Sequence, residues 1–90
     1  MASRRIHYWR DRSGHEVDFV LEQDGALVAL ELKASHQVSP SDAAGLAAFR
    51  AGLGKGRHLK CGVVLHAGDA RPLGEGLYAL PWNWLVPNDR

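Results

Sequence analysis

The sequence predicts one small α/β domain built on a mixed sheet, and three observations favour this class. Two stretches near the N-terminus alternate apolar and polar residues with a period of two, which is typical of strands. A segment with helix-start signals follows them, and a short apolar run comes after that segment. We therefore expect an antiparallel three-stranded meander, a crossover helix and a further parallel strand.

The first three strands are predicted by residue type and by the turns between them. Residues 5–10 are rich in strand formers, and residues 11–14 have turn chemistry. Residues 15–22 and 27–33 alternate, so each should place one set of side chains on either face of the sheet. Residues 23–26 are expected to close a hairpin between them.

A helix is predicted over residues 40–53. Ser39 is a good N-cap, Pro40 suits the first helical position, and Asp42 lies three residues after the cap. Gly54 is expected to end the helix.

The C-terminal part should complete the sheet. Residues 59–65 form a short apolar run with two valines, which we interpret as a buried strand reached by a right-handed crossover. Residues 77–80 predict a weaker final strand. Residues 81–87 are apolar and aromatic, so we expect them to pack on the same sheet or on a second copy of the chain, which predicts a homo-oligomer.

Composition limits the class of protein. A chain of ninety residues is expected to form one domain, residues 1–90. Eleven Lys and Arg oppose ten Asp and Glu, so the net charge gives no argument for nucleic-acid binding. The single Cys61 excludes an internal disulfide and a cysteine zinc site, which favours a reducing compartment such as the cytoplasm. No apolar run approaches the ~20 residues of a membrane span, so no membrane partner is expected.

The predicted hairpin register sorts the two strands into an apolar and a charged face. A two-residue turn at Asp24 and Gly25 is the commonest arrangement for this dipeptide, and it fixes the residues that face each other. On one face the expected pairs are Val17 with Leu32, Phe19 with Leu30 and Leu21 with Val28. We expect the helix to cover this apolar face, which would then be the core.

On the other face the same register places Asp18 opposite Glu31 and Glu16 opposite Lys33. Two carboxylates facing each other on a sheet are destabilising, and a bound Mg²⁺ would compensate because it prefers oxygen ligands. A lysine beside it would orient or deprotonate a water, or neutralise charge on a phosphoryl group. The alternative is a half-exposed face on which Glu16 and Lys33 form a surface ion pair contributing ~0 to 1 kcal/mol. The pattern alone leaves both interpretations open.

The combination of Glu16-Val-Asp18 in one strand with Glu31-Leu-Lys33 in the next resembles the PD-(D/E)xK, or restriction-endonuclease-like, superfamily. More narrowly, residues 8–19, 29–35 and 45–49 look like the C-terminal domain of unknown function of bacterial AAA-type ATP-binding proteins. The resemblance implies that Asp18 and Glu31 hold Mg²⁺ or Mn²⁺. It also implies that Lys33 is the catalytic lysine, and that Glu16 is an acid standing behind the metal ligands.

Two departures from the family pattern matter. The superfamily core usually begins with a helix, and almost nothing precedes Arg4, so we expect a core that lacks its first helix or receives it from a partner. Residues 52–56 lack the spacing of a phosphate-binding loop, so the ATPase part is absent. We interpret the chain as a C-terminal fragment or stand-alone remnant of that larger architecture.

Two functions follow from these expectations. The first is a divalent-metal-dependent DNA phosphodiesterase that uses Asp18, Glu31 and Lys33. The alternative is a non-catalytic interaction or dimerisation module of an AAA-type ATPase, in which the acids are a remnant. Fold resemblance does not choose between them.

Overall fold

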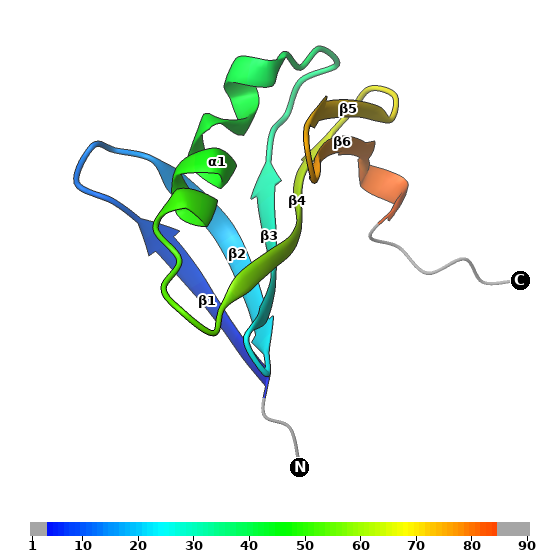
Figure 1. Cartoon of the computed structure of the whole chain (residues 1–90). Coiled ribbons are helices and arrows are strands. Elements are labelled where there is room, and N and C mark those ends of the chain that lie inside the picture. The colour runs from blue at the N-terminus through cyan, green and yellow to red at the C-terminus, as the bar shows by residue number, and fades with distance from the viewer. Residues whose placement is uncertain (1–3, 85–90) are drawn as a thin grey trace, which may run out of the picture.

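The computed structural model describes residues 4–84 and shows a single mixed sheet with one helical segment lying across it (Figure 1). The six strands are β1 (Arg4–Arg10), β2 (Glu16–Gln23), β3 (Ala26–Leu32), β4 (His58–His66), β5 (Arg71–Gly74) and β6 (Leu77–Pro81). A 3₁₀ turn, η1 (Pro40–Ala43), leads directly into α1 (Ala44–Ala51), and η2 (Trp82–Trp84) follows the last strand.

The strand order β1-β2-β3-β4-β6-β5 confirms the predicted plan and extends it. Strands β1 to β3 form the expected antiparallel meander, and β4 pairs in parallel with β3 after the helical crossover. The final predicted strand, β6, is parallel to β4. Strand β5 was not predicted, because its four residues, Arg71–Gly74, are too few to show alternation. Because β5 is an edge strand, it tolerates Pro72, which has no N–H to donate.

The helical segment begins where Ser39 and Pro40 predict it and ends earlier than expected. Its first turn is 3₁₀, with the Asp42 amide donating to the Ser39 carbonyl at 2.9 Å, and regular α-helix runs only to Ala51. No helix among residues 4–84 has the length and apolar character needed to cross a membrane.

The β2–β3 hairpin has the predicted register near its turn. Asp24 and Gly25 have φ values of 55° and 83°, the left-handed conformation that a two-residue hairpin turn requires at both positions. Pairing runs from Gln23 with Ala26 to Phe19 with Leu30. The predicted pair of Val17 and Leu32 is not part of this ladder.

A β-bulge in β2 explains why the ladder changes there. His7 pairs with Val20 and Trp9 pairs with Val17, so two residues of β2, Asp18 and Phe19, lie opposite Tyr8 alone. The extra residue shifts the alternation, and Val17 and Val20 are both fully buried although they are three residues apart. Period-two reasoning places them on opposite faces.

The face predicted to form the core is buried only at Val17. Three other residues predicted for it are 38–43% exposed: Phe19, Leu21 and Leu32. The helix packs instead on the face of Val20, Leu27 and Ala29, which join Leu46 and Phe49 in the core. Ala29 on that face leaves room for the helix, whereas the face that we expected to be covered carries the larger side chains of Phe19, Leu21 and Leu32.

Glycine at two positions makes this approach possible. A Cβ at Gly62 of β4 would lie 2.8 Å from Leu77 and 3.3 Å from Leu46 of α1, and a Cβ at Gly45 of α1 would lie 2.5 Å from the Glu16 carbonyl. The predicted apolar tail is described only as far as Trp84. Its remaining residues, 85–87, lie outside the described part of the chain.

Candidate functional site

Asp18, Glu31 and Lys33 lie where the β2–β3 ladder ends. Asp18 belongs to the bulge, Glu31 is the second-last residue of β3, and Lys33 directly follows that strand. The Leu32 amide donates a hydrogen bond to Asp18 Oδ2 at 2.8 Å. Asp18 therefore reaches β3 through its side chain, although the predicted pairing of Asp18 with Glu31 is not part of the ladder.

Glu31 is the most perturbed group in this region. Its carboxylate lies under the start of α1, because a Cβ at Gly45 would be 3.2 Å from Glu31 Oε1. That oxygen is buried and has no hydrogen-bond partner among the described residues. Burial, followed by the negative charge of Asp18, raises the pKa of Glu31 to about 7. The positive charge of Lys33 acts in the opposite direction on this pKa but does not outweigh burial and Asp18.

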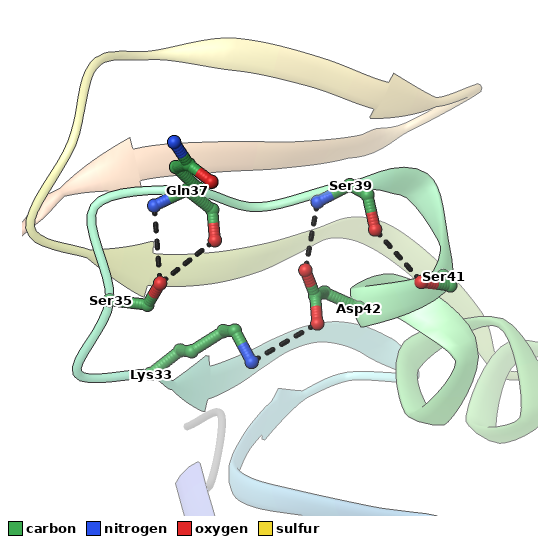
Figure 2. A network of polar contacts seen from close by, with 6 residues as sticks. All are labelled: Lys33, Ser35, Gln37, Ser39, Ser41 and Asp42. Atoms are coloured by element: carbon green, nitrogen blue, oxygen red, sulfur yellow. Dashed lines mark hydrogen bonds and ion pairs between the residues drawn. The ribbon is translucent and has the colours of Figure 1, made fainter.

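Lys33 pairs with an acid that the hairpin register did not predict. Its Nζ lies 3.1 Å from Oδ1 of Asp42, and the other oxygen of Asp42 accepts a hydrogen bond from the Ser39 amide at 2.8 Å. Figure 2 shows Asp42 between these two partners. Both contacts hold the pKa of Asp42 below its usual range, and the hydrogen bond from the Ser39 amide has the larger effect. Asp42 thus joins the end of β3 to the first helical turn.

The expected ion pair between Glu16 and Lys33 is replaced by this contact. The β2–β3 ladder stops at Phe19 and Leu30, so Glu16 is not carried opposite Lys33. Glu16 instead pairs across the backbone with Arg10 of β1. A side-chain hydrogen bond from Tyr8 to Glu16 raises the pKa of the Tyr8 hydroxyl.

Asp42 and Tyr8 are the two neighbours that sequence reasoning missed. Asp42 was interpreted only as a helix-start residue. The short distance in sequence between this helix start and the E-x-K strand was a usable signal that Asp42 lies near Lys33. No pattern pointed to Tyr8, because its approach to Glu16 depends on the bulge.

The residues present fit a loosely held divalent cation better than a fully protein-bound one. Among residues 4–84, no group of three or more His, Cys, Asp and Glu side chains is arranged to hold a metal. Asp18 and Glu31 offer two carboxylates, and Glu31 has a buried oxygen with no partner in the described chain. This set suits Mg²⁺, which is often bound by one or two carboxylates and keeps water and substrate phosphate as its other ligands.

One cavity lies away from this cluster. A cavity of about 460 Å³ opens at the hairpin end of the sheet, and its lining includes Ile6, Leu21 and Val28 but none of the three predicted site residues. Four of its eight lining residues are apolar and none belongs to the charged cluster, so we do not assign it to the charged site.

In a comparison with known protein families, the family described as Domain of unknown function (DUF4143) matches residues 1–85. No curated protein and no solved structure matches the chain.

Proposed function

The chain belongs to the family Domain of unknown function (DUF4143), and for this member we propose a divalent-metal-dependent phosphodiesterase that acts on DNA. The observation that carries the proposal is the buried, unbonded Oε1 of Glu31 beside the charge of Asp18. An arrangement selected only for stability would not favour two acids at the end of a ladder. A restriction-endonuclease-like core and a cytoplasmic location are parts of the same proposal, the latter because Cys61 is a free thiol.

Each residue has a distinct part in this proposal. Asp18 and Glu31 would hold Mg²⁺ or Mn²⁺, and the bound cation would supply a water of lowered pKa and stabilisation of phosphoryl charge. The hydrogen bond from the Leu32 amide fixes the Asp18 carboxylate. Lys33 neutralises charge on the phosphoryl group or orients the attacking water, and Asp42 holds its Nζ in place. Glu16 adds negative charge behind the two ligands.

Cleavage of a panel of single-stranded, duplex and branched DNA with Mg²⁺ or Mn²⁺ tests the proposal. We expect wild type to cut and Lys33→Ala to lose cutting. Because Lys33→Ala also breaks the ion pair with Asp42, Asp42→Asn is the matched control, since it breaks the same pair but keeps the lysine. Equal loss in both variants would show that the ion pair, rather than the lysine, is needed.

Metal binding can be measured without turnover. Calorimetric titration of Mn²⁺ should show binding to wild type and strongly weakened binding to Asp18→Ala and Glu31→Ala. Affinity that is unchanged in both variants would contradict the proposed metal site. The fold of each variant is checked by circular dichroism, because Asp18 also accepts the Leu32 amide.

A second candidate is a non-catalytic interaction module of an AAA-type ATPase. It is favoured by the structural bonds that two of the three site residues already make: Asp18 to the Leu32 amide and Lys33 to Asp42. The lack of a three-ligand metal group in residues 4–84 also agrees with it. A folded wild type that neither binds Mn²⁺ nor cuts any DNA would favour this candidate.

A further inference from the structure

The sheet has an uncovered apolar face on the side opposite α1. We call it the bare face and define it by the large residues that project from it with 38–69% exposure: Ile6, Tyr8, Phe19, Leu21, Leu32 and Tyr78. Directly paired residues project to the same side of a sheet, so the strand registers show that these residues belong together. One row runs from Phe19 through Leu30 and Val63 to Tyr78, and another runs from Ile6 through Leu21 to Val28.

A sheet of this kind is normally covered on both sides. Strands β3, β4 and β6 are mutually parallel, and sheets with parallel strands usually have both faces buried. Here α1 contacts β2, β3 and β4 on one side. Residues 62–66 of β4 are buried on both faces, so the apolar surface that lacks a second layer lies mainly over β1, β2 and β3.

Its area suits an interface between two chains. By the usual areas of such side chains, the six residues expose roughly 600 Å², at the upper limit for a patch on a monomer and close to the ~800 Å² that each partner buries in a standard interface. The half-buried Val28 and Leu30 add to this surface. The cavity of about 460 Å³ beside Leu21 and Val28 would receive side chains from a facing surface.

The charges at the border of the bare face identify the partner. At one end, Arg10 pairs with Glu16. At the other end, Glu22, Asp24 and Lys60 line the cavity. Each end therefore carries charges of both signs, so a second copy can set its acids against the bases of the first. A nucleic acid would require a border that is mainly basic.

We propose that two copies of this chain form a two-fold dimer by packing their bare faces against each other. A two-fold axis brings the same patch of both copies together, as this surface allows. The contact then lies on β1, β2, β3 and β6 rather than on the apolar C-terminal segment that the sequence suggested. This contact adjoins the proposed metal site at one end, because Tyr8 donates a hydrogen bond to Glu16 and the Leu32 amide donates one to Asp18.

The test is the oligomeric state of the full chain across about a hundredfold range of concentration, measured by sedimentation equilibrium. We expect wild type to approach twice the chain mass of 9.9 kDa. Leu21→Lys should raise the dimer dissociation constant by at least about tenfold, because it places a charge in the centre of the face. Ala51→Lys is the matched control, since it introduces the same charge at an exposed position on α1.

Ile6→Lys provides a second variant that should fold regardless, because Ile6 is the most exposed of the six residues and lies on edge strand β1. Loss of the dimer in Leu21→Lys and Ile6→Lys, with the Ala51→Lys dimer intact, supports the proposal. A wild-type chain that remains a monomer at every concentration overturns it, even if the face binds another protein. A dimer that survives both face variants overturns it as well.

Discussion

At the scale of single residues, Glu31 couples pH to stability. Its pKa is raised in the folded chain from 4.5 to about 7, chiefly by burial and then by Asp18. A carboxyl group of this kind favours the folded state while it remains protonated. Its contribution is full below the ordinary pKa and is lost as pH rises through the folded pKa. The relevant window is therefore about pH 4.5 to 7.

We predict that Glu31→Gln removes this pH dependence. In the presence of a chelator, wild type should lose about 1–2 kcal/mol of unfolding free energy between about pH 5 and about pH 8 through this group, after allowance for water screening. Glu31→Gln should be the more stable protein at the higher pH and should change little across the range. Urea unfolding at each pH measures the difference. Parallel pH profiles for the two proteins would show that Glu31 is not the responsible group.

Asp42 makes two contacts that can be separated by mutation. Asp42→Asn removes the charge that faces Lys33 but retains an oxygen for the Ser39 amide, so we predict a loss below about 1 kcal/mol. Asp42→Ala removes both contacts and should cost about 1 kcal/mol more, as expected for a lost helix-start acceptor. Unfolding midpoints in urea compare the two variants. Equal losses would mean that the Ser39 contact contributes nothing.

At the scale of elements, the packing of α1 depends on Gly45. A side chain there would meet the Glu16 carbonyl at 2.5 Å and Glu31 Oε1 at 3.2 Å. Backbone cannot move aside cheaply, so we predict that Gly45→Ala destabilises the fold by about 1–3 kcal/mol, although alanine is the better helix former. Gly54→Ala is the control, because a Cβ at Gly54 meets nothing within 4 Å. Equal unfolding midpoints for the two variants would show that α1 can move away from β2.

Local chemistry predicted the elements whose causes lie close together in the sequence. The Asp24-Gly25 turn set the hairpin register, and Ser39 with Pro40 marked the start of the helical segment. The bulge at Asp18 was not predictable in this way, because it depends on pairing with Tyr8 of another strand. Period-two counting continued through it and assigned Phe19 and Leu21 to the core.

The site shows the same division. The pattern placed Asp18 and Glu31 near each other, and the charge of Asp18 does raise the pKa of Glu31. The partner of Lys33 was predicted wrongly, because the ladder ends before Glu16 and the chain returns Asp42 to the end of β3. Which face the helix covers was decided by how closely it can approach, through Gly45 and Gly62, rather than by which face is more apolar.

At the scale of the whole molecule, the sheet separates two surfaces of different chemistry. The charged cluster forms where β2 and β3 part beneath α1. The bare face spans the other side and reaches from Ile6 and Leu21 near the hairpin turn to Leu32 beside the charged cluster. Three residues along a strand span roughly 10 Å, so Leu21 is about that far along β2 from Asp18. Substitutions separated by such a distance usually act independently.

We therefore predict that metal binding and dimer formation can be removed one at a time. Leu21→Lys should become a monomer while its Mn²⁺ affinity stays within about twofold of wild type, because no charge of the cluster is changed. Glu31→Gln should lose most of its Mn²⁺ affinity and keep the dimer. Calorimetry and sedimentation on the same samples measure both properties. If Leu21→Lys loses both, the metal site is assembled only in the dimer, and the two carboxylates of one chain are then insufficient to hold the cation.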